Sequence, residues 1–311
     1  VHTDLIATAP RRPRRGETVL GTAFASHPGG KGGNQAAQAA LQGCSTALVG
    51  RVGRDAFGER LLDALRSKGV RTELVEVDDE AATGVSTVLV GGDGDYASVV
   101  VPGASDRIDR AQIDAAEPAI AACRVLLAQL EIDVQATTHV ARLAKALGKT
   151  VVLNAAPAPT GATEELSDLW CCVDVVVANR GEAAALLGVD EHARASPGEV
   201  ARALRERLGT AAVVVTLGGD GAVLATASGE HAVPGFAVSV MDTVGAGDAF
   251  VGTLTSRLAR RTYLVSALGD ANAAGAIAVT RAGAFDALPT AAELDHFLNR
   301  GTVVAEPGRR R

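Results

Sequence analysis

From residue 108 onward, helix patterns alternate with short apolar strand patterns, and this rhythm restricts the possible fold more than any other feature. In chain order the patterns cover 109–121, 124–129, 133–147, 150–153, 174–178 and 211–216. Alternating units of this kind form a parallel sheet with helices on both faces. We therefore predict an α/β protein, and 311 residues with 47% hydrophobic content suffice for one large core.

Polar residues follow several of these predicted strands. They are Glu131, Asn154, Asn179, Glu182 and Gly218. Open parallel sheets bind ligands beyond the carboxyl ends of their strands, so these positions are candidates for a binding site. Asn179 and Glu182 also have the spacing of a helix N-cap with a capping box. The sequence leaves both interpretations open.

The segment Asp242–Phe250 reads DTVGAGDAF and joins a predicted strand over 237–241 to an apolar helix. Gly245 and Gly247 would let a ligand approach the backbone closely. The free amides and dipole of the helix N-terminus would bind an anion such as a phosphate in transfer. Asp248 is suited to take a proton from an attacking hydroxyl. The alternative is a glycine-rich helix start on which Asp248 is only an N-terminal charge.

A second glycine-rich segment, HPGGKGGNQ at 27–35, runs directly into an alanine-rich helix. Backbone amides there, with Asn34, could reach the hydroxyls of a polyhydroxylated ligand. The segment matches neither a Walker A loop nor a dinucleotide fingerprint. The alternative is a flexible turn.

Other segments extend or interrupt the main rhythm. Two successive strands, 83–90 and 96–101, surround a glycine-rich loop and predict a hairpin in a small accessory sheet joined by residues 5–24. A further strand is predicted over 45–50. The closing helices are predicted over 245–259, 265–280 and 291–298, and the tail 301–311 is expected to be disordered.

Charge and cysteine content exclude some partners. The net charge of −6 argues against nucleic acid, because no basic surplus is available to neutralise phosphates. No apolar run reaches the roughly 18 residues needed to cross a bilayer, so we expect no membrane partner. The four cysteines lack CxxC spacing and are interpreted as reduced core thiols of a cytoplasmic protein.

The motifs GGKGGNQAAQAA and DTVGAGDAFVGTL, in this order, resemble those of the PfkB-type sugar kinases. Shorter segments in register extend the resemblance over nearly the whole chain: VGRVGRDAFG, AQLE, NAAPAP, ANRGEAAALLG and TLGGDGA. The resemblance implies one ribokinase-like three-layer α/β/α domain over 1–311, with a mostly parallel sheet. It also implies a small β-sheet lid built from about 5–24 and 83–102, through which two copies would form a homodimer.

The implied activity is transfer of the γ-phosphoryl of ATP to a primary hydroxyl, with ribose as the favoured acceptor and another sugar or a nucleoside as alternatives. Asp248 would be the general base, with the amides of Gly245, Ala246 and Gly247 as the anion hole. The residues implied to hold the sugar are Asp4, Gly30, Lys31, Asn34 and Glu131.

The resemblance also implies roles toward the nucleotide and two cations. The residues implied to contact ATP are Asn179, Thr216, Gly218, Gly221 and Asn272. Glu182 would organise Mg²⁺ through water. The implied site for a monovalent cation, potassium, comprises Asp242, Thr243, Arg281 and Gly283.

The chain departs from the family pattern near its beginning and near the cation loop. His2 stands where a sugar-binding Asn is expected, and Ala287 replaces a small polar residue. Three residues before Asp4 are too few for the strand that should fix it, so we expect a coding sequence extended upstream by about ten residues. If that strand is truly absent, the alternative is a sugar-binding protein with little catalysis, which the intact Asp248 argues against.

Overall fold

The computed structural model describes residues 1–92, 95–159, 166–190 and 195–300; the predicted disordered tail lies outside them. Its largest sheet has the order β14-β13-β12-β11-β10-β9. These strands are β9 (Val125–Ala128), β10 (Thr150–Asn154), β11 (Val175–Asn179), β12 (Ala212–Thr216), β13 (Ala222–Thr226) and β14 (Gly229–Val233). Strands β9 to β12 are mutually parallel and β13 and β14 are antiparallel, which confirms the predicted strand and helix alternation.

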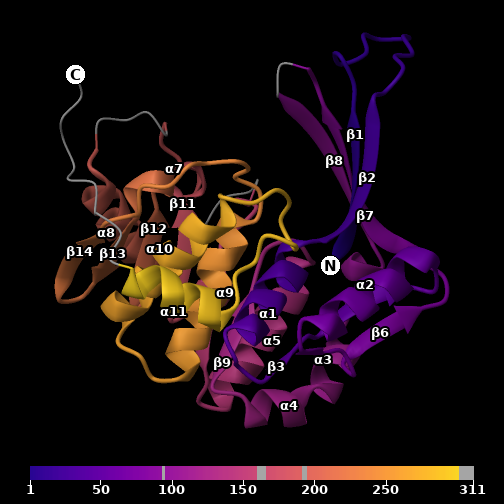
Figure 1. The fold of residues 1–311 in the computed structure, drawn as a ribbon. Coiled ribbons are helices and arrows are strands. Elements are labelled where there is room, and N and C mark those ends of the chain that lie inside the picture. The colour runs from indigo at the N-terminus through magenta and orange to yellow at the C-terminus, as the bar shows by residue number, and fades with distance from the viewer. Residues whose placement is uncertain (93–94, 160–165, 191–194, 301–311) are drawn as a thin grey trace, which may run out of the picture.

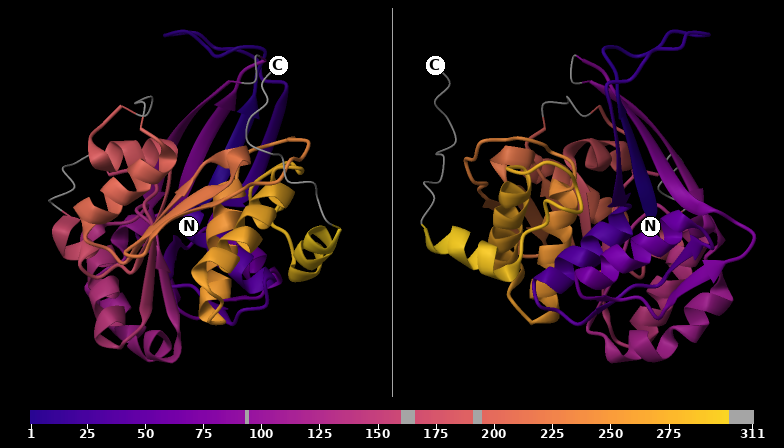
Figure 2. Two further views of the ribbon diagram at one scale, coloured as in Figure 1. Left: turned by 90° about the vertical axis from the view of Figure 1, so that its left-hand side faces the viewer. Right: turned by 45° about the vertical axis from the view of Figure 1, so that its right-hand side comes forward.

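Helices cover both faces of this sheet (Figures 1 and 2). One face packs on α3 (Arg110–Ala115), α4 (Glu117–Ala122), α5 (Val134–Ala146), α6 (Ser167–Trp170), α7 (Arg180–Leu187) and α8 (Pro197–Leu208). The other face packs on α9 (Ala246–Ala259) and α10 (Leu264–Ala278). Successive residues of β10 show why its run is uniformly apolar, because Leu153 belongs to the first core and Val152 to the second.

The prediction of one continuous helix over 109–121 is wrong. The structure has two short helices there, α3 and α4, which meet at Ala116. Pro118 lies in the first turn of α4. A proline has no N–H and clashes inside a helix, so it begins a new helix instead of continuing the old one.

Four strands form a second sheet that projects from the body of the molecule (Figure 1). Its order is β2 (Ala23–Gly29), β1 (His2–Thr8), β7 (Thr83–Val90) and β8 (Tyr96–Gly103). Asp4 is the third residue of β1, which pairs with β2 on one side and β7 on the other. Asp4 is therefore held by strand pairing on both sides, whereas the separate strand expected before it stays a prediction.

Two strand predictions are wrong. Residues 237–241 form no strand, and Val240 and Met241 are 63% and 69% exposed. The predicted strand over 45–50 shortens to β3 (Thr46–Ala47), and β4 (Gly50–Gly53) follows. Two unpredicted strands complete small parallel pairs: β5 (Val70–Arg71) with β3, and β6 (Val75–Asp78) with β4.

The remaining helices are α1 (Lys31–Leu41), α2 (Ala56–Ser67) and α11 (Ala291–Asn299). Asp55 caps α2 by accepting from the Phe57 and Gly58 amides at 3.1 and 2.9 Å. The same carboxylate accepts from the Thr83 amide at 2.8 Å, so the cap also fixes the first residue of β7. The base of the projecting sheet is thereby attached to the body.

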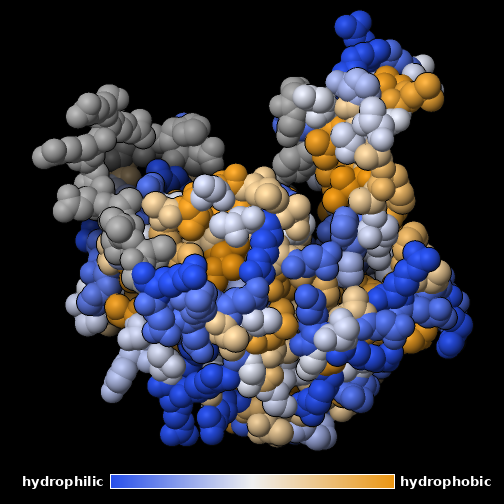
Figure 3. Space-filling view, in the orientation of Figure 1, coloured by the Kyte–Doolittle hydropathy of each residue, from blue (hydrophilic) through white to orange (hydrophobic). Residues whose placement is uncertain are grey.

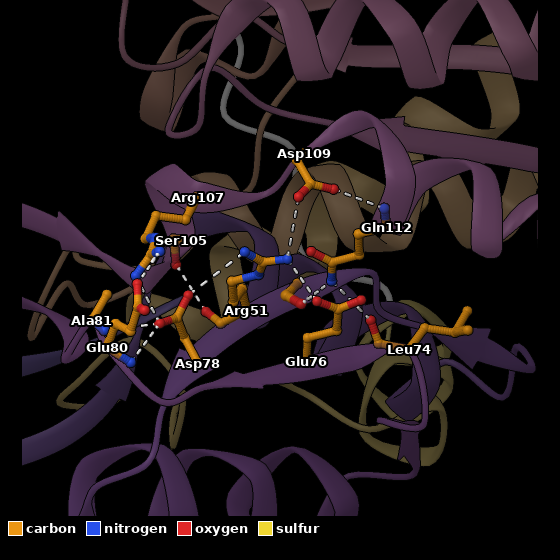
Figure 4. Close-up of polar contacts among 11 residues, drawn as sticks. Arg51, Leu74, Glu76, Asp78, Glu80, Ala81, Ser105, Arg107, Asp109 and Gln112 are labelled. Atoms are coloured by element: carbon orange, nitrogen blue, oxygen red, sulfur yellow. Dashed lines mark hydrogen bonds and ion pairs between the residues drawn. The ribbon is translucent and has the colours of Figure 1, made fainter.

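A network of ion pairs ties β4 and β6 to the 3₁₀ helix η1 (Ala104–Arg107) (Figure 4). The Arg51 guanidinium lies 2.6 Å from Glu76 and 3.6 Å from Asp78. Arg107 approaches Asp78 and Glu80 at 2.9 and 2.8 Å. These groups line a pocket of about 340 Å³. Because the opposite charges already pair with one another, we interpret the network as a structural tie.

The cysteines are only partly as predicted. All four are free thiols, but Cys171 is exposed, Cys44 and Cys123 are half-buried, and only Cys172 is buried. Their interpretation as core thiols is therefore wrong for Cys171, which ends the short helix α6 at the surface. No helix in the described part of the chain has both the length and the hydrophobicity to cross a membrane.

Candidate active site

Asp248 lies at the contact between α1 and α9, in the first turn of α9. Its side chain accepts two hydrogen bonds from α1. The Asn34 Nδ2 donates to Oδ2 at 2.8 Å, and the Gln35 Nε2 donates to Oδ1 at 2.9 Å. Asp248 is 8% exposed and Asn34 is 4% exposed. The two glycine-rich motifs of the sequence therefore meet through the side chains that follow their glycines.

The surroundings of Asp248 shift its pKa upward. Burial is the largest cause, because it disfavours the charged carboxylate. The positive charge of Lys31 and the bonds from Asn34 and Gln35 oppose this rise, and the charge of Glu131 adds to it. A carboxylate with a raised pKa is a better proton acceptor near neutral pH than an ordinary one.

The start of α9 presents backbone amides without a side-chain cap. Gly245 is the N-cap, with φ 80°, and a Cβ there would lie 2.6 Å from Ala284 Cα, so only glycine fits. A Cβ at Gly247 would meet no atom within 4 Å, which shows that this residue borders open space. The Ala246 amide donates to the Thr243 carbonyl at 3.4 Å, and the amides that follow it in the first turn, with the helix dipole behind them, can bind an anion.

The predicted sugar-binding residues surround the start of α1. The Lys31 backbone amide donates to Glu131 Oε2 at 2.8 Å, which joins α1 to the loop after β9. Asp4 lies on β1 with His2 Nε2 3.2 Å from its Oδ1. A Cβ on Gly29, the residue before Gly30, would collide with the Asp4 carboxylate. The structure thus brings the β1 carboxylate next to the glycine-rich motif.

One polar atom in this region has no partner. Asn34 Oδ1 is buried and accepts no hydrogen bond from the described residues. The amide cannot turn over to correct this, because its oxygen would then face the Asp248 carboxylate. A buried acceptor left unpaired is costly, so a ligand that donates a hydroxyl hydrogen to Asn34 would remove that cost.

Four of the five predicted ATP-contacting residues lie at or just beyond the carboxyl ends of the neighbouring strands β11 and β12. Asn179 and Thr216 are directly paired at the ends of β11 and β12. Gly218 begins the 3₁₀ helix η3 (Gly218–Asp220), and Gly221 ends it. Asn272, on α10, donates from Nδ2 to the carbonyls of Val233 and Pro234, both at 3.1 Å. Asn272 therefore holds the chain after β14, a structural task that the sequence did not predict.

Glu182 and Asn179 form the capping box that the sequence left open. Asn179 Oδ1 accepts from the Glu182 amide, and Glu182 Oε2 accepts from the Asn179 amide, both at 2.8 Å. The pKa of Glu182 is raised, mainly by burial; the bond from Asn179 and the charge of Lys31 oppose this, and the charge of Asp248 adds to it. A half-buried carboxylate beside a second one favours a nearby cation.

No group of three or more His, Cys, Asp or Glu side chains suited to a metal occurs within the described ranges. Mg²⁺ that binds together with phosphates keeps several waters and needs only one or two protein carboxylates. Glu182, whose carboxylate is half-buried, is the residue that could hold such an ion through water.

The residues of the predicted monovalent-cation site come from two loops that one carboxylate joins. Asp242 accepts from the Val244 amide at 3.0 Å and from the Gly283 amide at 2.9 Å. The Arg281 side chain instead contacts Glu293 at 2.5 Å, so only its backbone can serve the site. Two loops fixed side by side can offer carbonyl oxygens, which suit a hard cation such as K⁺.

The model of the pfkB family carbohydrate kinases matches residues 1–291. This chain belongs to that family. The match covers both glycine-rich motifs, Asp248 and every other predicted site residue.

Members of this carbohydrate kinase family resemble the chain over most of its length. It is 36% identical to ribokinase from Mus musculus over 266 residues, 83% of this chain and 79% of that protein. It is 31% identical to deoxyribokinase from Salmonella typhi over 301 residues, 95% of each chain. The structure of Arabidopsis thaliana ribokinase complexed with ribose and ATP matches with a TM-score of 0.84, 26% identity and 96% coverage of each chain. The predicted ribokinase-like fold is confirmed.

Sequence reasoning missed part of this kinase's candidate site. Gln35 contacts Asp248 directly, and Gln129 and Asn154 contact Gln35. Gln35 follows Asn34 in the glycine-rich motif, Gln129 directly follows β9, and Asn154 ends the neighbouring strand β10. Their positions at strand ends were the available signal, which was noted only for Asn154.

Proposed function

We propose that this chain is an ATP-dependent kinase that phosphorylates the primary hydroxyl of ribose. The observation that carries the proposal is the buried Asp248 beside Asn34, whose own oxygen lacks a partner. A carboxylate with a raised pKa accepts a proton, and an unpaired amide oxygen accepts a hydroxyl hydrogen. A substrate with several hydroxyl groups satisfies both needs at once.

The reaction divides its work among these residues. The primary hydroxyl oxygen attacks the γ-phosphorus of ATP, the bond from that phosphorus to the β,γ-bridging oxygen breaks, and ADP leaves. Asp248 takes the hydroxyl proton. The amides at Gly245, Ala246 and Gly247 stabilise the charge on the transferring phosphoryl, because they are preorganised donors at a helix N-terminus. Lys31 adds a positive charge close to both Asp248 and Glu182.

The sugar and the nucleotide would occupy adjacent regions. Asp4, Gly30, Lys31, Asn34 and Glu131 would hold the sugar, and Asn179, Thr216, Gly218, Gly221 and Asn272 would border ATP. Mg²⁺, held through water by Glu182, would neutralise phosphate charge when bound. Potassium would bind between the loops of Asp242, Thr243, Arg281 and Gly283.

The choice of sugar is tested by ADP release from the purified chain with ribose, 2-deoxyribose, fructose and nucleosides. The names of the relatives favour ribose, with deoxyribose as the second candidate. We expect the highest kcat/KM for ribose. A higher value for deoxyribose would replace ribose as the substrate. Sugar binding without ADP release would support the alternative of a sugar-binding protein.

We also propose a homodimer formed through the projecting sheet, here called the lid sheet (β2-β1-β7-β8). Paired residues share a face of a sheet, so Asp4 and Ser86 face one way, and Phe24, Val99 and Val101 the other. The latter three are 70%, 67% and 52% exposed. Figure 3 shows apolar residues along this sheet. A second copy would cover them while the opposite face serves the substrate.

The cytoplasm is the proposed location. The four free cysteines fit a reducing compartment. ATP as the proposed phosphoryl donor fits the same compartment.

A further inference from the structure

A series of hydrogen-bonded side-chain amides, here called the amide series, connects the end of β9 with Asp248. The Gln129 Nε2 donates to Gln35 Oε1 at 2.6 Å. The Gln35 Nε2 then donates to Asn154 Oδ1 at 2.8 Å and to Asp248 Oδ1 at 2.9 Å. Asn154 in turn donates to the Val177 carbonyl at 3.1 Å. The amide series therefore links α1, α9 and the carboxyl ends of two parallel strands.

Gln35 is the centre of this amide series, and the orientation of its side-chain amide is fixed. It is fully buried, and both hydrogens of its amide nitrogen and its oxygen have partners. If the amide turned over, its oxygen would face the oxygens of Asn154 and Asp248, and its nitrogen would face the donor of Gln129. Only one orientation satisfies all four residues, so Gln35 presents a fixed donor to Asp248.

We propose that Gln35 is a positioning residue for phosphoryl transfer: its amide fixes the plane of the Asp248 carboxylate and keeps it ready to accept the hydroxyl proton. The proposal rests on the function proposed above. Asn34 holds Oδ2 of this carboxylate and Gln35 holds Oδ1, and Gln35 is itself held by Gln129 and Asn154 at the strand ends. A base displaced by about 1 Å can lose roughly 100-fold in rate, so such positioning matters for turnover.

Gln35 acts within a known set of charges. Lys31 on α1 attracts the Asp248 carboxylate, Glu131 after β9 repels it, and Asp248 in turn acts on Glu182 of α7. Replacing the Gln35 amide by a carboxyl group would add another acid 2.9 Å from Asp248 Oδ1. Two carboxyl groups so close share one proton and raise one ionisation by about 1–3 pH units.

The kinetic test compares Gln35→Glu and Gln35→Met with Gln38→Met. Gln38 is a matched control, because it is also fully buried on α1 and also bonds α9, at Thr253, but it does not contact Asp248. We expect both Gln35 variants to lower kcat by about 10–100-fold, the loss of a bond to a charged group, with a smaller change in KM for ribose. In Gln35→Glu the acid limb of kcat, which is the low-pH side of its pH profile, should move to higher pH by about 1–3 pH units.

Gln38→Met should lower the melting temperature and leave the acid limb in place. If Gln35 only supports packing, its variants will behave like Gln38→Met, and the proposal is wrong. A change confined to KM would also contradict it, because positioning of the base acts on turnover.

A second readout does not need activity. Protein labelled with ¹³C at the aspartate carboxyl carbons is titrated by NMR, and the Asp248 signal is identified by its absence in Asp248→Asn. We expect Asp248 to titrate at higher pH in both Gln35 variants than in the natural chain and in Gln38→Met. Unchanged titration in Gln35→Glu overturns the proposal. If the natural chain phosphorylates no sugar, the proposed function fails, and this titration still decides whether Gln35 controls Asp248.

Discussion

The Asn34 Nδ2 lies 2.8 Å from Asp248 Oδ2, although 214 residues separate the two in the chain. The packing of α1 along α9 creates this contact, and it gives Asn34 a double role. Its nitrogen holds the proposed base, and its buried oxygen has no partner among the described residues. One amide can therefore align the base with the hydroxyl that it deprotonates.

Asp248→Asn should strongly lower turnover without weakening the fold. We expect kcat to fall by about 10²–10⁴-fold, the range for a positioned proton acceptor. The pKa of Asp248 is raised in the folded state, so its stabilising contribution is complete below the unfolded pKa and lost as pH rises through the folded pKa. At neutral pH the neutral amide avoids this loss, and Asn34 can turn over to accept from it. Thermal melts at pH 7 should show an equal or higher Tm; near-normal kcat would exclude Asp248 as the base.

Lys31→Met should shift the pH dependence of the same group. The charge of Lys31 lowers the pKa of Asp248, so its removal raises that pKa further. Activity depends on the deprotonated base, and the acid limb of kcat/KM should therefore move to higher pH. Lys31→Arg keeps the charge and should move the limb much less. Equal limbs in Lys31→Met and the natural chain would contradict the electrostatic coupling.

Much of this site could be predicted from the sequence because its residues lie in local patterns. Valine runs separated by helix patterns predicted β9 to β12, and glycines at a helix start predicted the surroundings of Asp248. The pairing of β4 with β6 could not be predicted, because a four-residue strand depends on a partner distant in the chain. Gln35 was missed for the same reason: an amide on an alanine-rich helix acquires its role only when α9 packs against it.

Glu182→Gln separates a metal role from a capping role. Glutamine also completes a capping box, so the helix should remain, while the negative charge that favours Mg²⁺ is lost. We expect a higher Mg²⁺ concentration for half-maximal rate and a small change in Tm. Glu199→Gln is the matched control, because Glu199 forms the same capping box with Ser196 on α8 but is exposed. Equal Mg²⁺ requirements in the two variants would mean that Glu182 acts only as a helix cap.

Val99→Lys tests the proposed dimer. Val99 is 67% exposed on the face of the lid sheet opposite Asp4, and a buried unpaired lysine there would prevent two such faces from meeting. We expect light scattering after size-exclusion chromatography to show a dimer for the natural chain and a monomer for Val99→Lys. Ser98→Lys, on the other face of the same strand, should remain dimeric. A natural chain that is monomeric throughout the concentration range would end the proposal.

Gly29→Ala should weaken sugar binding through Asp4. Glycine at this position leaves room for the Asp4 carboxylate, which a Cβ would displace. If that carboxylate accepts hydrogen bonds from two sugar hydroxyls, its displacement should raise KM for ribose, as should Asp4→Ala, each by about 10-fold or more for charge-assisted bonds. The two changes should not add, because the colliding atoms are absent in Asp4→Ala and the Gly29→Ala change then meets no obstacle. We would measure KM for both single variants and the double variant, with Tm as the control for folding. Additive losses in the double variant would mean that Gly29 acts on the site by a route independent of Asp4.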